Sequence, residues 1–291
     1  MIKSKLLEYR ADLLLLSVAI AWGATFLMVQ DVIKNVGVYS FLFWRFLLST
    51  ILIYIIFSNK IKSFDKSSAV NGMILGLFLF AGFATQTFGL AYTKSSIVAF
   101  ITGLNVIIVP FASYIIFKGH VRKMVFISSI IALMGLYFLT MSAELSLGFG
   151  EALSFICAFM FALHILFTGR FSGKNDVFVL VFFQFLTVTI LSMIFSISLE
   201  DITFNVNFDY TFIKAILVTA VFATVYAFMI QTYMQQYTTP TKTAIIFTME
   251  PVSAAIFGYF MINEILTPMQ MFGAVLIISA TLIAEINFKK T

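Results

Sequence analysis

The chain alternates long apolar runs with short polar gaps along its whole length. A helix that crosses a bilayer needs roughly 20 mostly apolar residues, whereas a membrane β-barrel strand alternates in polarity over about ten. The runs of this chain are apolar on every face, which favours helices. They lie at about 12–29, 39–57, 70–90, 96–117, 124–140, 151–168, 177–199, 213–235, 242–261 and 269–286. The pattern therefore predicts an all-α polytopic membrane protein with ten transmembrane helices and no soluble domain.

The first run has the outline of a cleavable signal peptide, because Lys3 and Lys5 precede an apolar stretch that contains Ala19 and Ala21. The apolar sequence continues through WGATFLMV, however, and the run has a counterpart in the second half of the chain. We therefore expect the first run to be retained as a transmembrane helix.

Composition agrees with a membrane protein and narrows the possible partners. The chain is 61% hydrophobic and 11% charged, whereas soluble domains carry about 25% charged residues. Its pI of about 9.2 would suggest nucleic acid only if the basic residues clustered on one soluble face, and they are scattered through short gaps. Cys157 cannot form an intrachain disulfide, and no Cys–His spacing is typical of zinc. We expect no nucleic-acid partner, no metal and no cofactor.

The distribution of Lys and Arg predicts the orientation in the membrane. If the N-terminus is cytoplasmic, 14 of the 18 Lys and Arg residues fall in cytoplasmic segments, three fall outside, and Arg45 lies within a run. Short cytoplasmic loops are enriched in Lys and Arg because translocating basic loops is disfavoured. We therefore predict an integral protein of a bacterial-type inner (plasma) membrane with both termini cytoplasmic.

Two polar phrases recur half a chain apart: FATQTFGLAYTKSS begins at Phe83 and FMIQTYMQQYTTPT at Phe228. The residues that match, each shifted by 145, are Phe83/Phe228, Gln86/Gln231, Thr87/Thr232, Tyr92/Tyr237 and Thr93/Thr238. Earlier in the chain the shift is 139, which places Arg45 opposite Gln184. A longer loop in the second half accounts for the difference between the two shifts.

The repeat predicts two halves, residues 1–145 and 146–291, each with five runs. Because five is odd, the second half must enter the membrane from the opposite side, so we expect the halves to form inverted five-helix repeats. Inverted repeats are typical of secondary transporters. Our hypothesis is that the two copies of the phrase secure two gating hairpins, one at each mouth. The alternative is that both only join helices by hydrogen bonds.

Several motifs resemble one transporter group across essentially the whole chain. They are AIAWGATFL in the first run, FWRFLL in the second, TKSSIVAFITGLNVIIVPFASYIIF in the fourth, and TTPTKTAIIFTMEPVSAAIFGYFMINEILTPMQMFGAVLIISA in the last two. The chain resembles the EamA-type drug/metabolite transporter superfamily. The resemblance implies ten helices in two inverted repeats around a central cavity, and export or exchange of amino acids and other small metabolites. Two features depart from the group: Phe161 and His164 stand where the sixth run often has Trp, and Glu264 has no acidic counterpart in KGHVRK.

Three ionisable residues stand out because they lie well inside apolar runs, where such residues are costly and mark candidate sites that face a cavity. Glu250, followed by Pro251, suits proton coupling or an amine-bearing substrate; the alternative is a structural ion pair or hydrogen bond. Arg45 suits a carboxylate or phosphate, or else it extends to the outer interface or anchors a helix end. His164 suits a proton relay or a hydrogen-bonded packing role.

A second set of residues completes the predicted site. Trp22 suits stacking on a substrate, or helix packing, and Asn105 suits a hydrogen bond to substrate or between helices. Gln86 and Gln231 complete the predicted substrate-binding set, and the predicted hinge or gating residues are Pro110, Pro251, Tyr92 and Tyr237. The many Phe residues are expected to face lipid or pack between helices.

We predict a secondary transporter that works by alternating access and exports amino acids or similar small metabolites. We expect coupling to protons or another gradient, and a monomer or homodimer among membrane lipids. Cationic or aromatic drugs and sugars remain alternative substrates, whereas nucleotide sugars are disfavoured because only Arg45 is available for phosphate. The chain is not expected to be an enzyme, because it has no Ser–Lys or Asp pair, acidic cluster or group of His. ATP-driven transport by this chain alone is not expected either, because the sequence has no GxxxxGK phosphate loop. A membrane scaffold or an intramembrane enzyme is the alternative from a different class.

Overall fold

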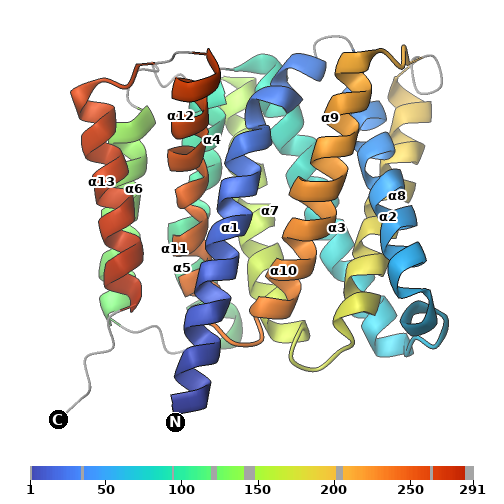
Figure 1. Cartoon of the computed structure of the whole chain (residues 1–291), viewed down its shortest axis with the longest axis horizontal. Coiled ribbons are helices and arrows are strands. Elements are labelled where there is room, and N and C mark those ends of the chain that lie inside the picture. The colour runs from blue at the N-terminus through green and yellow to red at the C-terminus, as the bar shows by residue number, and fades with distance from the viewer. Residues whose placement is uncertain are drawn as a thin grey trace.

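The structure is a computed structural model that describes residues 2–33, 36–93, 95–118, 123–140, 148–200, 206–262 and 265–285. These residues form a bundle of helices whose axes run roughly parallel (Figure 1), and no strand occurs among them. The α-helices are α1 Ile2–Val32, α2 Val38–Lys62, α3 Lys66–Tyr92, α4 Ser95–Gly103, α5 Asn105–Phe117, α6 Lys123–Thr140, α7 Phe149–Phe171, α8 Val177–Leu199, α9 Tyr210–Ala220, α10 Ala227–Met234, α11 Pro240–Phe247, α12 Met249–Ile262 and α13 Pro268–Glu285. A π-helix, η1, occupies Val221–Tyr226 between α9 and α10.

Eight helical stretches in the described part of the chain are long and apolar enough to cross a membrane. They coincide with the second to ninth predicted runs, and their exposed surface is rich in Ile, Leu, Phe and Tyr. Helix α1, with 31 residues, and the shorter α13 occupy the positions of the first and last runs. The predicted all-α polytopic membrane fold is therefore confirmed.

The bundle has two distinct ends (Figure 1). Helix α1 begins and α13 ends at the same end, which we call the N-terminal face; the other end is the opposite face. Helices α2 and α7 finish at the N-terminal face, and α3 and α6 begin there. Which of the two faces is cytoplasmic stays a prediction, and so does the division of the chain at residue 145.

The fourth and ninth predicted runs are each broken into two helices. Leu104 (φ −59°, ψ −14°) separates α4 from α5, and Thr248 (φ −64°, ψ −9°) separates α11 from α12. At each break the backbone N–H donates to the carbonyl three residues earlier, at 3.1 Å, which is the tighter 3₁₀ pattern. Pro110 lies inside α5 and Pro251 in the first turn of α12. Both runs are thus interrupted, while the role of the prolines as hinges stays a prediction.

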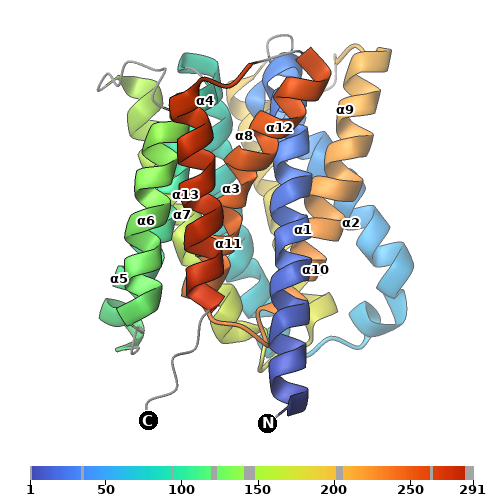
Figure 2. The same cartoon turned by 60° about the vertical axis from the view of Figure 1, so that its left-hand side comes forward.

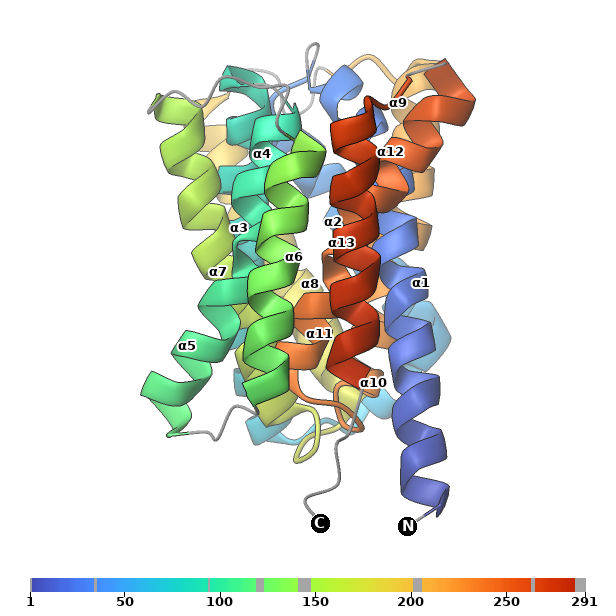
Figure 3. The same cartoon turned by 90° about the vertical axis from the view of Figure 1, so that its left-hand side faces the viewer.

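Helices α6 and α13 pack against each other along one edge of the bundle, as Figures 2 and 3 show. Their backbones meet at Gly135 and Gly273: a Cβ atom built on Gly273 would lie 2.6 Å from the Gly135 carbonyl oxygen. Small residues allow this close approach between membrane helices, where van der Waals packing replaces the hydrophobic effect. Elsewhere α2 packs on α8, α3 on α7 and α8, and α1 on α12.

We predict that Gly273→Leu lowers the free energy of unfolding by about 1–3 kcal/mol, because the added side chain must separate two backbones in contact. Thermal unfolding of the purified protein in detergent measures the change. Val275→Leu on the same helix is the control, since Val275 is 58% exposed toward the surroundings of the bundle. Equal free energies of unfolding for Gly273→Leu and Val275→Leu would contradict the close contact between α6 and α13.

Candidate functional site

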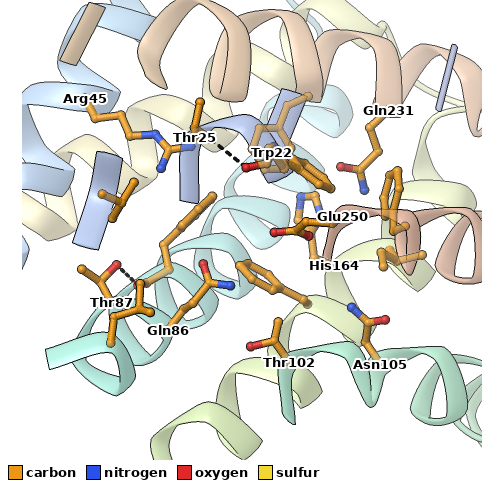
Figure 4. Close-up of a pocket in the computed structure, with 17 residues that line it drawn as sticks. Trp22, Thr25, Arg45, Gln86, Thr87, Thr102, Asn105, His164, Gln231 and Glu250 are labelled. Atoms are coloured by element: carbon orange, nitrogen blue, oxygen red, sulfur yellow. Dashed lines mark hydrogen bonds between the residues drawn. The ribbon is translucent and has the colours of Figure 1, made fainter. Parts of the chain in front are cut away.

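A pocket lies inside the bundle and is lined by residues from both halves of the chain (Figure 4). One part of the lining is aromatic and comprises Trp22, Phe83, Phe161, Phe228 and Phe247. The polar part comprises Thr25, Arg45, Gln86, Thr87, Thr102, Asn105, His164, Gln231 and Glu250. The walls therefore combine aromatic ring surfaces with one basic group, Arg45, and one acidic group, Glu250.

The pocket brings together all seven residues of the predicted substrate-binding set, which come from α1, α2, α3, α5, α7, α10 and α12. The predicted hinge and gating residues Pro110, Pro251, Tyr92 and Tyr237 do not line it. Tyr92, at the end of α3, is 62% exposed, and Tyr237 lies in the turn between α10 and α11. Glu264 falls outside the described residues. The role of each residue in binding or gating stays a prediction.

Arg45 is held inside the bundle by hydrogen bonds to the π-helix. Its Nε donates to Thr224 Oγ1 at 2.7 Å and its Nη2 to the Ala223 carbonyl at 3.2 Å. The guanidinium carbon lies 4.6 Å from the centre of the Phe83 ring, which adds a cation–π contact. Arg45 is only 4% exposed, so the alternative in which it extends to the outer interface is wrong.

The π-helix η1 positions two pocket residues at once. The Ala223 carbonyl accepts a hydrogen bond from Trp22 Nε1 at 2.9 Å as well as from Arg45. Thr224 Oγ1 in turn donates to the Thr219 carbonyl five residues earlier, at 2.9 Å. The wide π turn, a feature common at functional sites, thus serves as the acceptor for donors on both α1 and α2.

Glu250 and Asn105 enter the pocket directly after the two helix breaks. Asn105 is the first residue of α5, and Glu250 lies in the first turn of α12. A helix N-terminus carries partial positive charge and stabilises a nearby carboxylate. Neither side chain makes a hydrogen bond within the described part of the chain, so both remain available to a ligand. Gly23 allows α1 to reach this break, because a Cβ there would lie 2.6 Å from the Glu250 carbonyl oxygen.

His164 is hydrogen-bonded and packed at the edge of the pocket. Its Nε2 lies 3.0 Å from Gln184 Oε1, and its ring contacts that of Phe228. The residue is 2% exposed. This geometry favours the packing interpretation, although the ring still borders the cavity.

The side-chain amide of Gln231 has one atom without a hydrogen-bond partner among the described residues. Its Nε2 donates to Gln235 Oε1 at 3.4 Å, whereas its Oε1 is buried without a hydrogen-bond partner among the described residues. Buried polar atoms in proteins are nearly always paired, so this acceptor is suited to a donor supplied by a ligand. Gln86, its counterpart in the doubled phrase, also lines the pocket.

Matched positions of the two halves line the pocket in pairs. The pairs, given by the shifts of 139 and 145, are Trp22/Phe161, Thr25/His164, Phe83/Phe228, Gln86/Gln231, Thr102/Phe247 and Asn105/Glu250. Aromatic character and Gln recur within pairs, whereas the ionisable groups do not. Arg45 is likewise matched with uncharged Gln184. The pocket therefore has similar residues at several matched positions, whereas its positive group, Arg45, and its acidic group, Glu250, each stand opposite an uncharged residue.

The sequence interpretation missed the aromatic wall and the three Thr residues of the pocket. Phe residues were expected to face lipid or pack, but Phe83, Phe161, Phe228 and Phe247 border the cavity. A signal existed for three of them: Phe83 and Phe228 belong to the doubled phrase, and Phe161 is the counterpart of Trp22. No local signal in the sequence predicts the π-helix.

Comparison with known proteins gives a consistent result. The EamA-like transporter family matches residues 9–141 and 148–285. A protein of Archaeoglobus fulgidus named "Uncharacterized transporter" is 33% identical over 277 residues, covering 95% of this chain and 86% of the relative. A second protein of that organism with the same name is 21% identical over 263 residues, covering 88% and 90%. A solved structure titled "Crystal structure of protein" has a TM-score of 0.75 at 15% identity and covers 97% of this chain and 96% of its own, which shows a shared fold.

We predict that Thr224→Val lowers the free energy of unfolding by about 1–3 kcal/mol, because Arg45 Nε would lose its buried acceptor. Thr224→Ser keeps the hydroxyl and serves as the control. Chemical unfolding in detergent measures both variants. In an Arg45→Met background the cost of Thr224→Val should shrink, and an undiminished cost would contradict the role of Thr224 as the acceptor for Arg45.

Proposed function

Because the chain belongs to the EamA-like transporter family, we propose that it exports amino acids or closely similar small metabolites across the cytoplasmic membrane by alternating access. The resemblance seen in the sequence motifs is thereby confirmed at the level of the family. A family of transporters implies a small-molecule substrate and a lipid environment. The substrate class, the direction of transport and the coupling are proposals.

The observation that carries the proposal is that Arg45 and Glu250 share one pocket with an aromatic wall. In Figure 4 the two side chains reach the cavity from different sides. A guanidinium is suited to a carboxylate, and Glu250 together with Gln231 Oε1 is suited to an ammonium group. The aromatic rings supply an apolar surface for a side chain. A zwitterion with an apolar side chain satisfies all three groups at once.

Other substrate classes fit the pocket less well. A phosphate-bearing substrate would need several basic residues, and Arg45 is the only Lys or Arg among the residues that line the described pocket. A purely cationic drug would pair with Glu250 but would leave Arg45 without an anionic partner. The balance of charge thus favours a neutral zwitterion over either.

The proposed orientation has the N-terminal face in the cytoplasm. The described basic residues near helix ends gather there, namely Arg10, Lys60, Lys62, Lys66, Lys118, Lys123, Arg170, Lys174 and Lys242, whereas Lys214 lies near the opposite face. This asymmetry follows the positive-inside rule. Glu250 is the proposed proton carrier. Its protonated carboxyl group can release the proton when the ammonium group of a substrate binds beside it.

We predict that Glu250→Gln lowers flux of the transported amino acid at least tenfold in proteoliposomes, because the ammonium group loses its ionic partner. Glu250→Asp, which keeps the charge, should retain part of the flux. Thr281→Val is the control: Thr281 lies on α13 away from the pocket and bonds only to its own helix. Undiminished flux of every substrate in Glu250→Gln would remove Glu250 from the mechanism.

We also predict that the wild-type protein discriminates by charge within one set of aromatic compounds. Phenylalanine should raise the melting temperature more than 2-phenylethylamine or 3-phenylpropionate, each of which lacks one charged group. A ligand at a hundred times its Kd stabilises by about 2.7 kcal/mol, which a thermal-shift assay resolves. Equal shifts with the amine and the amino acid would contradict a role for Arg45 in binding the carboxylate.

A further inference from the structure

A hydrogen bond lies at the opposite face of the bundle, beside the first copy of the doubled phrase. Thr93, directly after α3, donates from Oγ1 to Glu151 Oε1 at 2.7 Å. Glu151 lies in the first turn of α7 and is 7% exposed. The neighbouring Gly150 packs on the same loop, because a Cβ there would lie 3.0 Å from Thr93 Cβ. The start of α7 is thus fastened to the loop that leads into α4.

A similar hydrogen bond lies at the N-terminal face beside the second copy. Thr238, between α10 and α11, donates from Oγ1 to Asp12 Oδ1 at 3.1 Å. Asp12 belongs to α1 and is 8% exposed. This bond fastens α1 to the loop that leads into α11.

The two bonds occupy matched positions of the two halves. Thr93 and Thr238 are 145 residues apart, and Asp12 and Glu151 are 139 apart, the same two shifts that pair the residues of the pocket. Each bond connects the loop before a broken helix with the helix that opens the other half of the chain. Because α3 ends at the opposite face and α10 at the N-terminal face, the bonds lie at the two ends of the bundle (Figure 1).

At the N-terminal face, ion pairs reinforce the hydrogen bond between Thr238 and Asp12. Lys242 Nζ lies 2.6 Å from Asp12 Oδ2 and 3.0 Å from Glu8 Oε1, and Lys242 is 2% exposed. The matched position of Lys242 in the first half is the apolar Ile97. Separating buried ion partners leaves charges without compensation, so this end resists opening more strongly than a hydroxyl bond alone would.

We propose that Thr93–Glu151 and Thr238–Asp12 are a pair of matched latches, one at each mouth of the pocket, and that Lys242 biases the resting protein toward closure of the N-terminal face. This inference deepens the proposed alternating access. Both latches are formed in the present structure. Access from one face requires that face's latch to break while the other holds, so removing one latch favours the state open on its side.

The experiment follows access to the pocket from each side of a vesicle. A single cysteine at Thr25, which lines the pocket, reports access in a Cys157→Ala background. A membrane-impermeant maleimide is added from one side or the other, and the labelling rate is measured without substrate. This readout does not depend on transport. The labelling rates can therefore reveal the latches even in a chain that does not transport amino acids. Labelling rates that contradict the latches would leave the flux experiment unaffected.

Thr238→Val should raise labelling from the N-terminal face about fivefold and lower it from the opposite face, since one hydrogen bond is worth on the order of 1 kcal/mol. Thr93→Val should do the reverse. Lys242→Met should act like Thr238→Val with a larger change. Thr281→Val, which removes a hydroxyl bonded only within α13, should change neither rate.

Changes of the same sign in Thr93→Val and Thr238→Val, or no change in either, would overturn the latches and leave two bonds that only join helices. An effect of Lys242→Met no larger than that of Thr238→Val would overturn the bias. If a Val variant does not accumulate as folded protein, Asp12→Ala and Glu151→Ala remove the acceptors of the same two bonds, with the same opposite signs expected.

Discussion

The lack of water in the hydrocarbon core is the constraint on which the rest of the structure depends. A backbone group without a partner there costs several kcal/mol, so irregular backbone persists only where protein satisfies it or where it lines a cavity. The interruptions at Leu104, Thr248 and η1 all lie near the pocket and all have partners. The breaks close with 3₁₀ hydrogen bonds, and the Ala223 carbonyl receives Trp22 and Arg45. At η1 the backbone carbonyl that the helix leaves free is therefore satisfied by two pocket side chains.

The arrangement of charge follows from this constraint. A guanidinium in an apolar bundle needs acceptors, and the π-helix provides two of them, one from the backbone and one from Thr224. A carboxylate benefits from the N-terminus of a helix, and the break before α12 creates one in the middle of a run. A regular helix in place of η1 would leave no free backbone carbonyl for Arg45, and an unbroken helix before α12 would place no helix N-terminus beside Glu250. Helix irregularity and buried charge thus depend on each other in this protein.

Much of the fold could be predicted from the sequence, because the length of an apolar run reports directly on the bilayer. The seven residues of the predicted binding set do meet in one pocket, since polar groups in apolar runs have few other places to lie. The aromatic wall could not be predicted, because a Phe that faces lipid and a Phe that faces a cavity look alike in a chain with 36 of them. The π-helix and the partner of His164 also depend on contacts between helices that no local pattern contains.

The doubled phrase separates into two parts with different surroundings. Gln86 and Gln231 line the pocket, whereas Thr93 and Thr238 lie at the ends of the bundle. The halves share Phe, Gln and the two Thr–acid bonds. They differ in four other ionisable groups, because Arg45, His164, Lys242 and Glu250 each stand opposite an uncharged residue. A symmetric frame permits two equivalent states, and only an asymmetric set of charges can orient a substrate and make one state preferred. In the proposed mechanism, the differences between the halves determine the substrate and the similarities allow the motion.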